Sequence, residues 1–150
     1  MKQISKLLTL LLLMACNNSG TKSSNEVKTK TDSLRGEVME AHNIGMAKME
    51  KISEAQKKVQ HAMDSISKLP ANLQKQSVGY KMQLDSILGR LKYSDYAMNQ
   101  WMEEFNMDSE ANNTERQIKY LESEKIKISK VRDAMISSLQ KADSLLKAKF

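Results

Sequence analysis

The sequence predicts an all-α protein, an extended antiparallel three-helix bundle that runs up, down and up behind an N-terminal targeting segment and a flexible tether. Two features of composition favour long helices: aromatic residues make up only 5% of the 150 residues, and there are one proline and five glycines. The third observation is the recurrence of apolar residues every three or four positions over three long stretches. We therefore divide the chain into residues 1–15 (targeting segment), 16–31 (tether) and 32–150 (bundle).

The targeting segment is a short basic start followed by an apolar run. Lys2 and Lys6 precede the run from Leu7 to Leu13. A membrane-spanning helix needs about 20 apolar residues, roughly twice what this segment provides. The run has none of the regularly spaced polar positions of a buried globular helix. A secretory signal peptide has this order, in which a basic segment is followed by an apolar segment and then by small residues.

The signal peptide ends in Leu13-Met14-Ala15-Cys16, which resembles the lipobox of bacterial lipoproteins. The resemblance implies that Cys16 receives a diacylglycerol on its sulfur, that the chain is cut before it, and that its new amino terminus is acylated with a fatty acid such as palmitate. Cys16 is the only cysteine, so it has no disulfide partner within the chain. The alternative is a short membrane helix followed by an unrelated cysteine.

The residues after Cys16 predict a location and a tether. Asn17 stands where an aspartate would favour inner-membrane retention in proteobacterial lipoproteins, and no acidic run follows it. By this analogy the anchor lies in the outer membrane and the protein faces the periplasm. Residues 17–31 are almost entirely polar, which predicts a flexible segment about 20 Å in typical end-to-end distance.

The first predicted helix begins near Thr31, at residues suited to capping exposed amides, and continues to Leu69, because Pro70 disfavours helical geometry before it. Its inward positions alternate by four and three. They are Val38, His42, Gly45, Met49, Ile52, Gln56, Val59, Met63 and Ile66, widened by Leu34, Met39, Met46 and Ala62.

The second and third predicted helices follow two polar turns, at Pro70-Ala71-Asn72 and at 107–113. The second helix runs to about Asn106 and carries one apolar face, with Asp95 on it: Leu73, Tyr80, Leu84, Ile87, Leu88, Leu91, Met98, Trp101, Met102 and Phe105. The third runs from about Thr114 toward Lys147, and Lys125 and Arg132 interrupt its seam. That seam is Ile118, Leu121, Ile128, Met135, Leu139, Ala142 and Leu146.

Short turns between helices about 50 Å long require antiparallel neighbours. The rival arrangement is a dimer of long hairpins, so self-association stays open. The wide apolar stripe of the first helix favours the closed bundle, because it must be buried against more than one neighbour.

The charge pattern argues against nucleic acid as a partner. The formal net charge is +6, and it falls to +4 when Lys2 and Lys6 are removed with the signal peptide. The excess is spread among acidic residues, and no basic stripe alternates with aromatic residues. We expect a solvated charged surface.

One end of the predicted bundle gathers side chains that could carry chemistry. Counting from the Pro70 turn places His42 opposite the stretch from Asp95 to Met102, with Lys125 at a similar height. Thioether, imidazole and indole groups suit a Cu(I) or Ag(I) ion. The candidate ligands are His42, Met46, Met49, Met98, Trp101 and Met102. The alternative is ordinary core packing, in which methionine and tryptophan contact one another without a metal.

If this end is packed core, His42 and Asp95 should form a buried polar pair, because an unpaired buried polar group costs roughly 1–3 kcal/mol. The same two residues could be two members of a catalytic triad, but no cysteine or suitably placed serine completes it. No glycine-rich phosphate loop or zinc-spaced set is present in the sequence, so we predict no enzymatic activity. His61 falls off the seam and is expected at the surface.

The same region carries a resemblance to a family. Glu37-Val38-Met39, His42, Met46 and Met49, then Ala97-Met98 and Trp101-Met102 before Phe105, are similar to a group of small bacterial lipoproteins often labelled "viral A-type inclusion protein" and common in Bacteroidetes-like genomes. The resemblance covers most of the mature chain and implies no activity. Asn43 and Asn99 depart from its pattern, in which an acid often follows the histidine and another methionine follows the Ala-Met pair.

Two function classes follow from the sequence. The first is a non-enzymatic, lipid-anchored interaction or structural module of the cell envelope, whose helical faces bind an envelope protein. The second is a periplasmic Cu(I) or Ag(I) binder that uses the histidine, methionine and tryptophan cluster. Apart from the lipid on Cys16, the first class needs no cofactor.

Overall fold

The computed structural model describes the backbone of residues 19–148 and the side chains of residues 29–148; over this range the chain is helical and contains no strand. The signal peptide, the lipobox and Cys16 lie outside it. Five helices follow one another along the chain. They are α1 (Ser19–Met46), α2 (Met49–Ser67), α3 (Ala71–Gln76), α4 (Val78–Glu104) and α5 (Thr114–Lys147).

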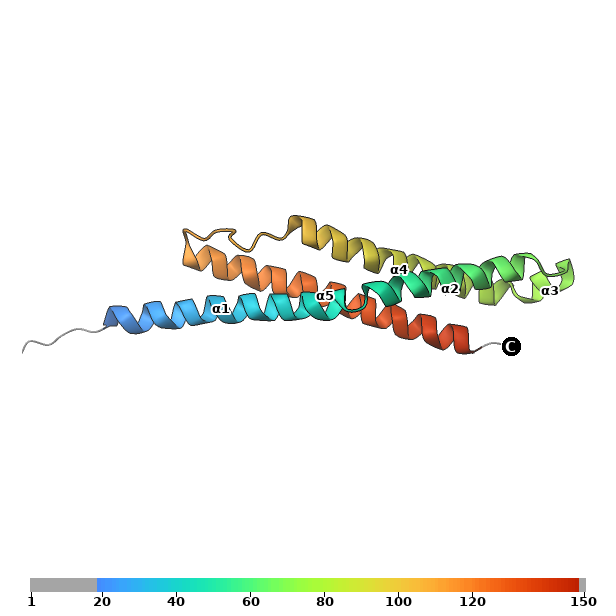
Figure 1. Cartoon of the computed structure of the whole chain (residues 1–150), viewed down its shortest axis with the longest axis horizontal. Helices are drawn as coiled ribbons and strands as arrows, with labels where there is room; N and C mark the ends of the chain where they lie inside the picture. The colour runs from blue at the N-terminus through green and yellow to red at the C-terminus, as the bar shows by residue number, and fades with distance from the viewer. Residues whose placement is uncertain (1–18, 149–150) are drawn as a thin grey trace, which may run out of the picture.

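The long helices lie roughly along one axis and give an elongated molecule (Figure 1). α1 and α2 run in one direction, α4 returns, and α5 runs in the direction of α1. α1 packs chiefly against α5, whereas α2 packs chiefly against α4 and touches α5 over a much smaller stretch. The chain from α1 to α2 therefore changes its main neighbour part-way along the molecule.

A turn at Ala47 and Lys48 makes that change possible. The sequence predicts one helix from about Thr31 to Leu69, and this is wrong, because the structure divides it into α1 and α2. Lys48 N–H donates to the carbonyl of Gly45 at 2.8 Å, a tighter step than the α-helical one, and Ile52 N–H then donates to Lys48 at 2.9 Å. Glycine is a common site for such a bend, and nearly continuous hydrogen bonding keeps the two helices in a similar direction.

α1 also begins earlier than predicted. Its backbone is helical from Ser19, so the described part of the predicted tether, residues 19–31, is helix and not extended chain. The sequence has no proline or glycine between Thr21 and Lys30, and nothing there stops a helix from growing. Thr31 is buried, and Lys30 forms an ion pair with Glu122 of α5 at 2.9 Å. Contacts with α5 thus supply a reason for order that polar composition did not reveal.

The connection after α2 is longer than the predicted three-residue turn. Pro70 precedes the short helix α3, and Ser77 separates α3 from α4. The Ser77 hydroxyl donates to the carbonyl of Leu73 at 2.9 Å, so it satisfies an acceptor at the end of α3. At the other end of the molecule α5 spans the predicted range, and the Asn113 side chain caps it by accepting from Arg116 N–H at 3.0 Å.

The core runs along the axis between the long helices. α1 and α2 supply inward residues at the predicted three-and-four spacing, and α4 and α5 complete each layer. Its buried members are Val38, Ala41, Ile52, Val59, Ile66, Leu84, Ile87, Leu88, Leu91, Met98, Trp101, Ile128, Met135 and Ala142.

Candidate functional site

Four rings form a column across the end of the molecule where α1, α4 and α5 meet. The centroids of the His42 and Trp101 rings are 5.5 Å apart, with the planes tilted by 36°. Trp101 stacks on Phe105 at 4.6 Å, and Phe105 stacks on Tyr120 at 6.3 Å. These separations are typical of favourable ring contacts, so the column ties α1, α4 and α5 together.

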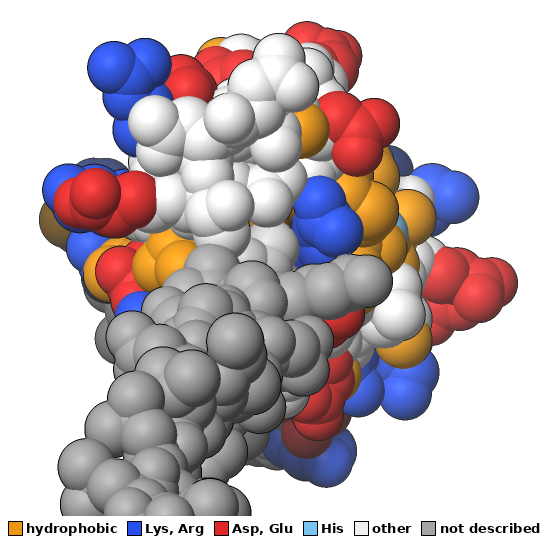
Figure 2. All heavy atoms as spheres, turned by 90° about the vertical axis from the view of Figure 1, so that its left-hand side faces the viewer, with side chains coloured by type: hydrophobic (Ala, Val, Ile, Leu, Met, Phe, Trp, Pro, Cys, Tyr) orange, Lys and Arg blue, Asp and Glu red, His pale blue; other side chains and the backbone are white. Residues whose placement is uncertain are grey.

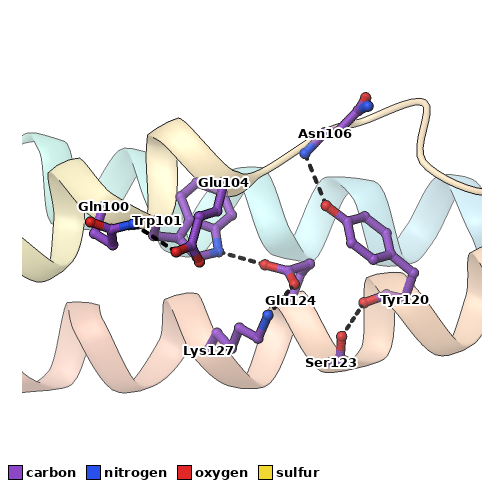
Figure 3. A network of polar contacts seen from close by, with 8 residues as sticks. All are labelled: Gln100, Trp101, Glu104, Asn106, Tyr120, Ser123, Glu124 and Lys127. Atoms are coloured by element: carbon purple, nitrogen blue, oxygen red, sulfur yellow. Dashed lines mark hydrogen bonds and ion pairs between the residues drawn. The ribbon is translucent and has the colours of Figure 1, made fainter.

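A buried carboxylate lies beside this column. The Trp101 indole N–H donates to Glu124 Oε2 at 2.9 Å, and both side chains are almost fully buried, at 5% and 3% exposed. Lys127 Nζ donates to the other oxygen, Oε1, at 2.7 Å (Figure 3). Both carboxylate oxygens of Glu124 are therefore bonded, which offsets the large cost of burying a charge.

Lys127 closes this arrangement from the solvent side. The hydrogen bond to Glu124 raises the pKa of the Lys127 ammonium above its usual value, while partial burial opposes the rise and the negative charges of Glu124 and Glu104 add to it. Lys127 therefore stays charged and held to Glu124. Glu104 also accepts from the Gln100 side chain at 2.6 Å, one turn from Trp101 (Figure 3).

Tyr120 attaches the connection between α4 and α5 to the same site. Its hydroxyl accepts from the backbone N–H of Asn106 at 2.9 Å, just after α4 ends (Figure 3). Its own carbonyl accepts from the Ser123 hydroxyl at 2.7 Å. The ring column, the carboxylate and the connection therefore form one continuous structural unit.

The predicted pair of His42 and Asp95 does not form. No hydrogen bond or ion pair joins the two side chains, and within the described range the ring Nδ1 of His42 has Asn43 Oδ1 as its neighbour, at 3.1 Å. The cause is the register of α4, whose buried positions include Leu91, Ser94 and Met98. Ser94 thus takes the core position, and Asp95, the next residue, is only half-buried at its edge.

Ser94 has a polar partner of its own. Its hydroxyl lies 3.2 Å from that of Ser138 on α5, and it also donates to the Arg90 carbonyl at 2.9 Å. A serine pair therefore joins α4 to α5 at the depth where the sequence suggested a histidine and an aspartate.

The predicted metal ligands are only partly brought together. His42 lies beside Trp101, and Met98 is fully buried and approaches Gly45, one turn from His42. Met49 is half-buried against the core, whereas Met46 and Met102 are 38% and 36% exposed. Residues 29–148 contain no group of three or more histidine, cysteine, aspartate or glutamate side chains placed to hold a metal ion. The Cu(I) or Ag(I) site stays a prediction.

Lys125, predicted at a similar height to His42, has its partner outside the cluster. It forms an ion pair with Glu37 of α1, and the Lys30–Glu122 pair joins the same two helices one turn away. The hydrogen bond from Lys125, and then its positive charge, hold the pKa of the Glu37 carboxyl below its usual value. Lys125 therefore links α1 to α5 at their surface.

Glu124 is the site residue that sequence reasoning missed. It lies between Leu121 and Ile128 at the three-and-four spacing of the α5 seam. Apolar periodicity does not predict it, because glutamate is not an apolar residue. A buried tryptophan usually needs a hydrogen-bond acceptor, and that requirement could have pointed to a carboxylate on the seam.

The surface at this end of the molecule is mixed in charge. Figure 2 shows Lys and Arg side chains interspersed with Asp and Glu, with small hydrophobic areas between them. Such a surface lacks the one-signed field that attracts a polyanion.

Comparisons with protein-family models, with curated proteins and with solved structures found no match for this chain. Among the helices of residues 19–148, none has the length and the apolar character needed to cross a membrane.

Proposed function

We propose that this protein is a lipid-anchored, non-enzymatic module of the bacterial cell envelope that binds an envelope protein through its helical faces. The observation that carries the anchor is Leu13-Met14-Ala15-Cys16 at the end of an apolar run too short to span a membrane. The resemblance to small bacterial lipoproteins supports the same reading. The anchor is assigned to the outer membrane, with the helices in the periplasm.

The proposed architecture is a three-helix, up-down-up bundle in which α1 and α2 together form the first, bent member. The opposite direction of α4 and the shared direction of α1 and α5 support it (Figure 1). The ring column and the buried Glu124 are then structural, because the Trp101 indole N–H, both Glu124 oxygens and the Tyr120 hydroxyl are engaged by neighbours within the bundle.

An exposed stripe on α4 supports the assignment of a protein partner. Val78, Met82, Tyr93 and Tyr96 lie within one face of the helix, and the last three are 68%, 64% and 61% exposed. Tyrosine and methionine are enriched in protein interfaces, where they supply apolar area and, for tyrosine, a hydrogen bond. The stripe follows the long axis, as a surface for another elongated protein would.

Labelling with radioactive palmitate in the native host tests the anchor. The wild-type chain should incorporate label, and Cys16→Ser should lose it and leave the membrane fraction. Asn17→Ser, which changes the neighbouring residue and keeps the thiol, serves as the control and should be labelled normally. Equal labelling of wild type and Cys16→Ser would refute the anchor.

A further inference from the structure

The change of neighbour between α1 and α2 leaves a groove at the far end of the molecule. Because α2 lies against α4, its other flank separates from α5, and a hollow of about 810 Å³ opens between them. This volume is within the range of about 300–1,000 Å³ typical of small-molecule sites. Its apolar lining comes from all three helices and the turn after α2: Ala62, Ile66, Leu69, Tyr80 and Leu146.

The groove is charged at one end only, and the hydroxyls of Ser65 and Tyr80, which also line it, donate to backbone carbonyls. Lys57, Lys58 and His61 line it toward the middle of α2, whereas Ile66 and Leu69 line it toward the tip of the molecule. Within the described range neither the Lys57 ammonium nor the His61 ring has a hydrogen-bond or ion-pair partner, so both can accept a ligand.

Three acidic groups near the basic end already have partners within the protein. Asp64 accepts from Gln60 at 2.9 Å, Glu54 lies 3.9 Å from Lys58, and Asp143 of α5 is paired with Lys147 at 2.6 Å. The Lys57 ammonium therefore remains available to an anion from solution.

We propose that this groove binds a fatty acid, with the carboxylate at Lys57, Lys58 and His61 and the hydrocarbon chain extending past Ala62 and Ile66 to Leu69. Charge at one end and apolar side chains along the rest match a single-chain anionic amphiphile. A bound peptide would place polar backbone groups all along the groove, where the apolar lining cannot satisfy them.

The length of the groove agrees with this ligand. Lys58 and Leu69 are eleven residues apart, which is about 16 Å at the helical rise of about 1.5 Å per residue. An extended chain of about twelve to fourteen carbons spans about 14–16 Å, because each carbon–carbon bond of about 1.52 Å advances the zigzag by about 1.25 Å. The ligand is also distinct from the acyl chains proposed for Cys16, because Lys57 lies on the order of 55 Å along α1 and α2 from Ser19. The inference does not depend on the anchor.

Calorimetric titration of the full chain with dodecanoate, below its micelle concentration, tests the site. We expect saturable binding, and we expect dodecyltrimethylammonium, which has the same chain and the opposite charge, to bind at least about fivefold more weakly. Absence of saturable dodecanoate binding, or equal affinity for the two amphiphiles, would overturn the proposal.

Two charge reversals distinguish binding at the groove from attraction by the net charge of the surface. Lys57→Glu should weaken dodecanoate binding about fivefold or more, whereas Lys130→Glu, which changes net charge equally on an exposed part of α5, should leave it unchanged. Equal effects of the two substitutions would show that only net charge attracts the ligand and would refute the groove.

A third variant tests the hydrocarbon part. Ala62→Trp fills the groove and should abolish binding of both amphiphiles. If that variant loses helical circular dichroism, Leu69→Gln at the open end replaces it, and we expect a weaker affinity for dodecanoate.

Amide chemical-shift changes in the wild type should cluster at residues 57–69 and near Leu146. Shifts centred on the ring column, or an unaltered affinity in the filled or polar variant, would contradict the proposal.

Discussion

At the scale of single residues, Glu124 shows how a buried charge is tolerated in a narrow helical core. Its carboxylate receives one hydrogen bond from Trp101 and one from Lys127, and the lysine keeps 57% of its side chain exposed. Lys127 therefore needs little desolvation to reach the buried oxygen. The Trp101 ring in turn contacts the His42 ring and stacks on Phe105, so the position of the acceptor helps to fix the ring column.

Removing this acceptor should be costly. Glu124→Leu leaves the indole N–H of Trp101 buried without an acceptor, and we expect the free energy of unfolding to fall by about 1–3 kcal/mol. Glu124→Gln keeps an oxygen for the indole and should cost less than about 1 kcal/mol, because Lys127 can turn to water.

Urea denaturation followed by far-ultraviolet circular dichroism measures both losses. Glu103→Leu makes the same change at an exposed position of α4 and should shift stability by about 0.5 kcal/mol or less. If Glu124→Leu were as stable as Glu103→Leu, the indole contact would have no energetic role.

At the scale of helices, the periodicity of the sequence predicts which residues of a helix face the core. The inward positions of α2 and α5, such as Ile52, Val59 and Ile128, follow the seam and are buried. The sequence does not predict the breaks at Lys48 and Ser77, because no proline marks them. Whether a segment packs against α5 or α4 is decided by tertiary contacts that local periodicity does not contain. Helical counting likewise placed His42 near Trp101, but it could not decide whether Ser94 or Asp95 takes the core position.

Gly45 shows how one residue sets the approach of α1 to its neighbours. A Cβ at this position would lie within 3.4 Å of Met135 Sδ and much closer to the methyl group of Met98. Gly36, on the same helix, has open space where its Cβ would be. Substitutions at these two glycines therefore distinguish the effect of helix propensity from the effect of close packing.

Alanine substitutions at these glycines should have opposite effects. Gly36→Ala should raise the free energy of unfolding by up to about 1 kcal/mol, the usual difference in helix propensity. Gly45→Ala should lower it by about 1–3 kcal/mol, because Met98 must move within a filled core. Thermal unfolding measures both changes, and adding Met98→Leu to Gly45→Ala should recover part of the loss. A higher melting temperature for both single variants would show that the close approach is not needed.

At the scale of the whole molecule, the helices separate three surfaces along one axis. The start of α1, which follows the proposed anchor, and the groove beside α2 lie toward opposite ends (Figure 1). The exposed stripe of α4 begins near the groove and extends toward the other end, on the side of α4 away from its buried residues. An anchored molecule would thus present the stripe along its length and the groove at a distance from the membrane.

Site-specific photocrosslinking in intact cells tests the partner surface. A photoreactive phenylalanine analogue at Tyr93 or Tyr96 should capture the same envelope protein, because both side chains project from the stripe into solvent. The analogue at Ser53, an exposed position on α2, serves as the control and should not capture it. Mass spectrometry of the crosslinked band identifies the partner. A band at twice the mass of this chain would instead mean that the stripe joins two copies. Failure at both tyrosines, or capture of the same proteins from Ser53, would refute the stripe as a specific surface, since random encounters do not depend on which helix carries the probe.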